Sequence, residues 1–256
     1  PVGSTGMQHP DGEILAARAA AKAGVPFTLS TMSICSIEDV AAHSPVPFWF
    51  QLYVMNDKDF VDAIIERARA ANCSALVLTL DLQIIGQRHK DLKNGLTSPP
   101  KLTIPNILNM MTKPRWAMGM LRTPRRQFRN IVGHVKGVTK LADLTAWANE
   151  QFDPKLDWDK VARIRDQWGG KFILKGILDA EDAKMAADAG ADALRLGCEE
   201  GVEDVLDDVG RDARAVVGDR HHQRQALALL SRPRHLHPGA VCCRDRDRAA
   251  DPRHSL

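Results

Sequence analysis

The stretch ALVLTLD, residues 75–81, is a nearly continuous apolar run that ends in Thr79 and Asp81. Such a run is typical of a parallel β-strand that is covered on both faces. Three similar runs also carry polar residues near their ends: PFTLSTM at 26–32 with Ser30, PFWFQLYV at 47–54 with Gln51 and Tyr53, and KFILKGI at 171–177 with Lys175. Polar side chains at the carboxyl ends of parallel strands build the active site of a β/α barrel. The pattern therefore predicts such a barrel with its site at that end.

Helical patterns separate these strands, as a β/α fold requires. An Ala-rich helix should end at Gly24, Ser36 and Asp39 have the spacing of a capping box, and residues 57–71 keep helical spacing of apolar residues. A further unit runs from the strand at 171–177 through a helix to residue 194. With PVGSTG at 1–6 as the first strand, we expect an α/β fold, an incomplete (β/α)8 TIM barrel with about strands one to six present.

The composition limits the class of protein. With 44% hydrophobic and 26% charged residues among 256, the chain is typical of globular proteins, and a net charge of +3 gives no support for a nucleic-acid partner. The five cysteines form no C-x-x-C or zinc-ligand spacing, so we expect no metal site and a reduced, cytoplasmic setting. No apolar run is long enough to span a bilayer. The start at Pro1, without an initiator Met, predicts an internal fragment or a processed product.

A basic insertion at about residues 95–160 interrupts the alternation of strands and helices. Between Pro99 and Lys140 it has nine Lys or Arg and no Asp or Glu, mixed with apolar residues such as Met110, Trp116 and Met118. One interpretation is a solvated lid whose apolar side chains pack on the barrel and whose charges attract an anionic substrate. The other is a surface for peripheral contact with an anionic membrane, such as the inner membrane.

Residues 1–194 are the predicted partial barrel, and residues 195–256 differ from them in kind. This tail has eleven Arg but no Lys, and no Ile, Phe, Tyr or Trp. With so few large apolar side chains it has little with which to fill a barrel interior. Its composition is that expected from out-of-frame translation of a GC-rich gene. The alternative is a genuine disordered, Arg-rich tail.

Several motifs, in order along the chain, resemble one known family. PVGSTGMQHPDGE, PFTLSTMSICSIEDVA, PFWFQLYV, LVLTLDLQIIGQRHKDLKNG and KFILKGILDAEDA resemble the FMN-dependent 2-hydroxy acid dehydrogenases and oxidases. QRHKDLKNGLTSPPKL and KPRWAMGML are most similar to the bacterial L-lactate dehydrogenase branch, of the quinone or cytochrome type. The resemblance covers about residues 1–194 and implies a (β/α)8 barrel that binds FMN.

The resemblance implies one set of residues at the cofactor: Thr5, Gly6, Ser30, Gln51, Thr79 and Lys175. Thr5 and Gly6 would offer backbone groups at the end of the first strand. Lys175 would lie at the N1/C2 edge of the flavin, where a fixed cation stabilises the negative charge of the reduced ring.

The resemblance implies a second set of residues at the substrate. Tyr53 and Arg88 would bind it, since a phenol donates a hydrogen bond and the planar Arg fork matches a carboxylate. Asp81 would orient a catalytic His. The family has that His in a Ser-Asn-His-Gly-Gly-Arg segment after the sixth strand, where this chain has LRLGCEEGVEDV at 194–205. The Asp-Gly-Gly-x-Arg and Gly-Arg motifs that hold the FMN phosphate in the family are absent from this sequence as well.

The implied function is the FMN-dependent oxidation of an L-2-hydroxy acid, most specifically of L-lactate to pyruvate. The electron acceptor would be a quinone, a cytochrome or oxygen, and a homo-oligomer is compatible with the resemblance. The alternative is a catalytically inactive fragment that lacks the His base and the FMN phosphate site. An FMN barrel for a different anionic substrate is disfavoured by Arg88 within QRHKDLKNG.

Overall fold

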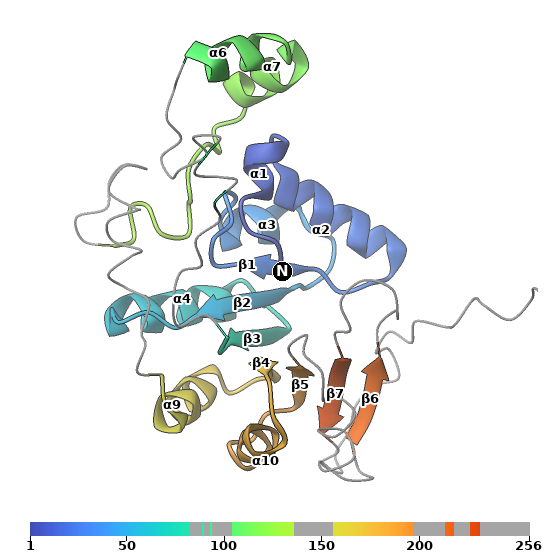
Figure 1. Ribbon diagram of the computed structural model, residues 1–256, viewed down its shortest axis with the longest axis vertical. Coiled ribbons are helices and arrows are strands. Elements are labelled where there is room, and N and C mark those ends of the chain that lie inside the picture. Colours follow the sequence, from blue (N-terminus) through green and yellow to red (C-terminus); the bar gives the residue numbers. More distant parts are fainter. Residues whose placement is uncertain are drawn as a thin grey trace, which may run out of the picture.

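The computed structural model describes residues 1–81, 89, 93, 104–135 and 156–196, together with the backbone of residues 213–217 and 226–230. A curved parallel sheet forms its centre (Figure 1). Its five parallel strands are neighbours in chain order: β1 (Thr28–Ser30), β2 (Trp49–Tyr53), β3 (Ala75–Thr79), β4 (Phe172–Ile177) and β5 (Ala193–Leu196). This order confirms the predicted β/α sheet of a barrel.

Helices connect the strands and pack on one face of the sheet, namely α2 (Gly12–Ala23), α3 (Ile37–His43), α4 (Lys58–Ala70), α9 (Trp158–Trp168) and α10 (Ala180–Asp188). Their ends follow from local sequence. Gly24 closes α2 with φ +68°, a left-handed conformation that glycine adopts without strain. The Ser36 hydroxyl accepts from Asp39 N and the Asp39 carboxylate accepts from Ser36 N, which confirms the predicted capping box of α3.

Alternation along the strands divides the side chains between two faces. Phe50, Leu52, Leu76 and Leu78 belong to the large core that the helices cover. On the opposite face a smaller apolar cluster joins Ala75, Val77, Ile173 and Ala193, with Trp49 packed against it. Successive side chains of a strand point to opposite faces, so the residue two positions after each member of this cluster lies on the same face as that member. This second face is the interior of the barrel.

The segment PVGSTG is not a strand, so the predicted first strand is wrong. Residues Thr5–Gln8 form the short helix α1, and Ser4 precedes it with φ +59°, in the left-handed region. The Ser4 amide donates to the Met32 carbonyl, 2.9 Å away, just after β1. A residue in the left-handed region ends an extended segment. The alternation of small and polar residues in PVGSTG could not reveal that Ser4 has this conformation.

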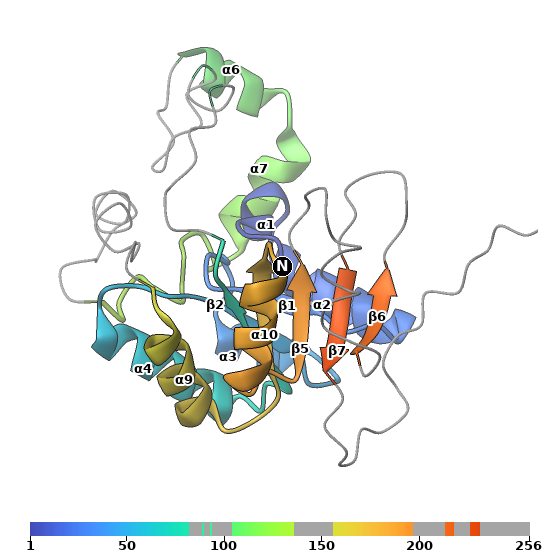
Figure 2. The same ribbon diagram turned by 60° about the horizontal axis from the view of Figure 1, so that its bottom comes forward.

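The backbone after β5 departs from the parallel pattern. Strand β7 (Ala226–Leu230) pairs with β5 in antiparallel fashion, and β6 (Ala213–Val217) pairs antiparallel with β7. Figure 2 shows this pair beside β5. Within the part of the chain that the structure describes, the parallel order therefore ends at β5.

The basic insertion contains two short helices that project from the barrel, α6 (Ile104–Met111) and α7 (Pro114–Arg122), as Figures 1 and 2 show. Helix α7 lies against α1, where Trp116 Nε1 donates to the Met7 carbonyl at 3.0 Å. A Cβ on Gly119 would come within 2.5 Å of the Pro10 ring, so α7 approaches this segment closely.

Apolar side chains of these two helices face outward. Ile104, Met111 and Leu121 are 75%, 71% and 72% exposed. These three side chains are therefore largely exposed rather than packed on the barrel. Over the described ranges, no helix combines the length and the apolar character that crossing a bilayer requires.

Candidate active site

Three side chains from neighbouring strands form a row on the interior face of the sheet. We call Ser30, Gln51 and Thr79 the polar row. Ser30 Oγ donates to Gln51 Oε1 at 3.0 Å, and Gln51 Nε2 donates to Thr79 Oγ1 at 2.9 Å. All three side chains are buried. The two bonds set the direction of the Gln51 amide, so the row offers hydrogen-bonding groups in one fixed arrangement.

Lys175 extends this row onto β4. It is the register partner of Thr79, and its Nζ contacts both carboxylate oxygens of Asp81 at 2.8 and 3.0 Å. Gly176 has φ +97°, and a Cβ there would lie 2.5 Å from the Cβ of Asp81. The close approach of Asp81 to β4 therefore requires glycine at 176, and the Asp81 carboxylate in turn holds the Lys175 ammonium.

Two further residues bring polar groups to the same edge. Tyr53 is the register partner of Thr79 on β2 and is half-buried. Burial, and after it the charge of Asp81, raises the pKa of Tyr53, so its phenol stays protonated at neutral pH and can donate a hydrogen bond. Arg195 is the register partner of Lys175 on β5 and adds a second cation to this end of the sheet. Arg88, predicted to bind the substrate carboxylate, lies outside the described residues.

Thr5 and Gly6 belong to α1 rather than to the end of a strand. The Gly6 amide donates to Glu13 Oε1 at 2.9 Å, and the Ile34 amide donates to the same oxygen at 3.1 Å. The carboxylate of Glu13, only 1% exposed, thus joins α1 to the segment that follows β1. Burial, and then this carboxylate, raises the pKa of the neighbouring Cys35 thiol to about 12.

Glu13 and Asn130 are two buried residues that the sequence motifs did not identify. Glu13 falls within the buried stripe of α2, beside Ile14 and Ala17. A charged residue among buried apolar positions indicates a side chain with buried hydrogen-bond partners, and this pattern could have been read from the sequence. Asn130 stands between Phe128 and Ile131, and nothing in its local sequence identifies its partners. The two residues contact the segments on which the polar row depends.

The donor set fits an isoalloxazine ring. The edge of that ring alternates carbonyl and N–H groups, and the row supplies an amide and two hydroxyls that can both donate and accept. The Gln51 Nε2 group has two hydrogens, and Thr79 is the one acceptor for it among the described residues. The Lys175 ammonium supplies positive charge on the adjacent strand, where negative charge develops on flavin reduction. These residues could therefore hold FMN by its ring.

A cavity of about 480 Å³ lies next to the Lys175–Asp81 pair. It is lined by the ends of β3 and β4 and by the first turns of α9 and α10, including Asp81, Gly176, Trp158 and Asp182. Asp81 is the expected site residue that lines it, so this space adjoins the polar row rather than containing it. No cluster of His, Cys, Asp and Glu suited to a metal ion occurs in the described ranges.

The chain is similar in sequence to curated L-lactate dehydrogenases. The chain is 44% identical over 233 residues to the L-lactate dehydrogenase of Ectopseudomonas mendocina (strain ymp), covering 90% of this chain and 60% of that protein. It is 42% identical over 228 residues to the L-lactate dehydrogenase of Caulobacter vibrioides (strain NA1000 / CB15N), covering 86% of this chain and 58% of that protein. The chain thus spans less than two thirds of the length of these relatives.

The chain also resembles solved structures of mandelate-oxidising enzymes. The monotopic membrane protein (S)-mandelate dehydrogenase superposes with a TM-score of 0.69 at 35% identity, over 75% of this chain and 51% of that one. A mandelate oxidase superposes with a TM-score of 0.54 at 31% identity, over 76% of this chain and 46% of that one. The family model of the FMN-dependent dehydrogenases matches residues 1–197, so the chain belongs to the FMN-dependent dehydrogenase family.

Proposed function

We propose that this chain takes part in the FMN-dependent oxidation of an L-2-hydroxy acid, most specifically of L-lactate to pyruvate. The observation that carries the proposal is the polar row with Lys175 beside it, on four neighbouring strands of a β/α sheet. The names of the curated relatives support lactate among the hydroxy acids. The electron acceptor is proposed to be a quinone, a cytochrome or oxygen.

Each side chain has a task that its position supports. Bound FMN would accept the two electrons that the substrate loses at its α-carbon. Ser30, Gln51 and Thr79 orient the ring by hydrogen bonds, and the Lys175 ammonium, kept in place by Asp81, offers a fixed positive charge at its edge. The protonated phenol of Tyr53 donates to the substrate carboxylate, and Arg88 would clamp that carboxylate as a planar fork.

Proton removal from the substrate requires a base. Asp81 lies beside the cavity and could accept a hydrogen bond from an imidazole there, which would orient the ring and stabilise its protonated form. The sequence has no Ser-Asn-His-Gly-Gly-Arg segment to supply that imidazole. A chain that binds FMN without turning over lactate is therefore the alternative outcome.

An FMN titration of the full 256-residue chain tests the proposal, followed by the visible flavin absorbance on adding L-lactate without oxygen. Saturable binding with loss of the oxidised flavin band would support the proposal. Lys175→Met should weaken FMN binding about tenfold or more, because it removes the cation and leaves Asp81 unpaired. Lys171→Met is the matched control, since Lys171 is exposed and directly precedes β4, at the end of the strand away from Lys175. Equal affinities for the two variants would contradict the role of Lys175, and binding without bleaching would favour the inactive alternative.

We also propose that α6 and α7 attach the protein peripherally to an anionic membrane. Exposed Ile104, Leu108, Met111 and Leu121 lie on these helices, α7 carries Arg115 and Arg122, and residues 104–135 contain no Asp or Glu. Apolar insertion and attraction to anionic lipid reinforce each other at such a surface. The structural relative described as a monotopic membrane protein supports this proposal.

Co-sedimentation with vesicles tests the attachment. The chain should bind phosphatidylglycerol-containing vesicles, and Leu121→Ser should reduce binding several-fold because it removes exposed apolar surface from α7. Leu15→Ser, at a 43% exposed position on α2, should leave binding unchanged. Equal binding of both variants would contradict attachment through these helices.

A further inference from the structure

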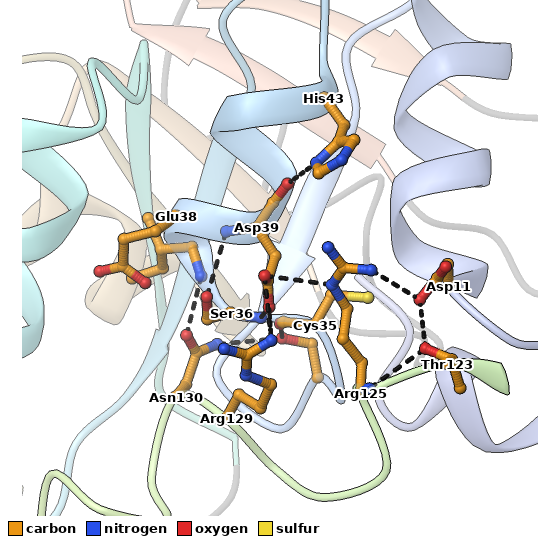
Figure 3. A network of polar contacts seen from close by, with 12 residues as sticks. Asp11, Cys35, Ser36, Glu38, Asp39, His43, Thr123, Arg125, Arg129 and Asn130 are labelled. Carbon is orange, nitrogen blue, oxygen red and sulfur yellow. Dashed lines mark hydrogen bonds and ion pairs between the residues drawn. The ribbon is translucent and has the colours of Figure 1, made fainter. Parts of the chain in front are cut away.

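Asn130 is a fully buried side chain on the segment that returns from α7 to the barrel. Figure 3 shows its amide pointing toward α3 and the backbone before it. Its hydrogen-bond partners lie more than 60 residues away along the chain, in elements that flank the polar row. A buried amide with this many distant partners fixes the relative position of those elements.

The carbonyl end of the amide holds the beginning of α3. Asn130 Oδ1 accepts from the Ile37 amide at 3.0 Å, and Arg67 Nη2 lies 3.5 Å from the same oxygen. Arg67 Nη1 also donates to the Asn130 backbone carbonyl at 3.0 Å. Arg67 is itself held by Glu38 on α3, at 2.7 and 2.9 Å. These contacts anchor Asn130 from one side.

The NH2 end of the amide holds the turn that follows β1. Asn130 Nδ2 donates to Ser33 Oγ at 2.9 Å and lies 3.5 Å from the carbonyl oxygens of Ser30 and Thr31. Ser33 in turn donates to the Cys35 carbonyl at 2.7 Å. The donor end of Asn130 therefore contacts the backbone of Ser30, the first residue of the polar row.

The same turn is joined to β2 from its other side. Thr31 Oγ1 donates to the Gln51 carbonyl at 2.6 Å and accepts from the Tyr53 amide at 3.2 Å. Ser30 Oγ accepts from the Met32 amide at 3.2 Å while it donates to Gln51. A displacement of the turn would consequently move the Ser30 hydroxyl relative to the Gln51 amide.

Ion pairs fix the segment that carries Asn130. Arg125 pairs with Asp11, before α2, and with Asp39 on α3, both at 3.1 Å, and Arg129 pairs with Asp39 at 3.1 Å (Figure 3). Thr123 Oγ1 donates to Asp11 at 2.7 Å. The return segment is thus attached to Asp11, before α2, and to α3 by residues that precede Asn130 in the chain.

We infer that Asn130 is a positioning residue for FMN binding: it holds the Ser30–Ser33 turn so that the polar row keeps its hydrogen-bonding arrangement. This inference rests on the proposed function, since it assigns Asn130 to the site that holds the flavin ring. Asn130 itself acts only through Ser30 and the turn.

Asn130→Asp tests the two ends of the amide separately, because it keeps the acceptor and removes the donor. The carboxylate retains an acceptor for the Ile37 amide and for Arg67, but it cannot donate to Ser33 or to the turn carbonyls. Asn72→Asp is the control, because it makes the same charge change at an exposed position after α4. Ser33→Ala removes the acceptor on the turn side, and it keeps the test available should Asn130→Asp fail to fold.

Hydrogen exchange of the apoprotein and FMN titration are measured on all four proteins. We expect Asn130→Asp to speed amide exchange in residues 30–36 about tenfold, the loss of roughly one hydrogen bond, with β3 and α4 unchanged. FMN affinity should fall about tenfold. The visible circular dichroism of bound FMN should also change, and a general loss of stability would not cause that change. Ser33→Ala should act in the same direction, and Asn72→Asp should match the wild type.

Unchanged exchange in residues 30–36 would overturn the inference. So would faster exchange with wild-type FMN affinity and dichroism, because the turn would then be held without consequence for the cofactor. If the wild-type chain itself bound no FMN, the proposed function would fail instead, and exchange in the apoprotein would alone decide whether Asn130 holds the turn.

Discussion

Replacing Glu13 by alanine should destabilise the protein by about 3 kcal/mol, although Glu13 is a charged residue near the start of a helix. Its buried carboxylate accepts from the backbone amides of Gly6 and Ile34 at 2.9 and 3.1 Å. Alanine would leave two buried N–H groups without an acceptor, and each such group costs about 1–3 kcal/mol. The two groups together cost about 2–6 kcal/mol, and relief of the desolvation of the carboxylate itself offsets part of that sum, which leaves about 3 kcal/mol.

Glu13→Gln should cost less than Glu13→Ala, about 1–2 kcal/mol. Its amide oxygen can still accept from both backbone groups, but the hydrogen bonds lose the strengthening that an ionised acceptor provides. The free energy of unfolding of each variant is measured by urea titration at neutral pH, with equal slopes required for comparison.

Glu66→Ala is the control, because Glu66 is exposed on α4, where it forms a surface ion pair with Arg69 at 3.3 Å. It should change the free energy of unfolding by less than about 0.5 kcal/mol. A Glu13→Ala variant as stable as the control would refute the bridging role of the carboxylate. A Glu13→Gln variant less stable than Glu13→Ala would refute the reasoning from unsatisfied amides.

Three further outcomes are expected. Gly176→Ala should lower the free energy of unfolding by about 1–3 kcal/mol and weaken FMN binding, because the position has φ +97° and a Cβ would meet Asp81 at 2.5 Å. Urea titration and FMN titration measure these losses, and both losses should be absent if Asp81 can move away from the new Cβ. Gly119→Ala should displace α7, because a Cβ at this position would clash with the Pro10 ring. Protease cleavage within residues 104–122 should therefore be faster than in wild type. Arg67, above all, lowers the pKa of Glu38 from 4.5 to about 2, so the stability that this carboxylate adds is complete above pH 4.5 and is lost as the pH falls toward 2. The stability difference between wild type and Glu38→Gln should therefore shrink over that interval, and a constant difference would contradict the assignment.

Local sequence was sufficient wherever a feature depends on neighbours along the chain. The apolar run at 75–81 predicted β3, Gly24 predicted the end of α2, and Ser36 with Asp39 predicted the capping box of α3. Burial of both faces, left-handed backbone and reciprocal capping each leave a trace within a few residues.

Local sequence was misleading where a distant contact decides the backbone. Pro1–Gly6 has the composition of a strand, yet Ser4 is left-handed and Thr5–Gln8 are helical, with Gly6 bonded to Glu13 and Ser4 to Met32. The outward apolar side chains of α6 and α7 likewise could not be distinguished from those of a packed lid by composition.

The sequence by itself determined the parallel β/α sheet, the alternation that places Ser30, Gln51, Thr79 and Lys175 on one face, and the family to which they point. These follow from periodicity and from motifs in order, which are properties of a linear chain. Only the tertiary structure decided that Lys175 pairs with Asp81, that Glu13 joins α1 to the loop after β1, and that Asn130 reaches the Ser30 turn. Such contacts join residues separated by up to a hundred positions, and their formation depends on how the sheet, helices and return segment pack together.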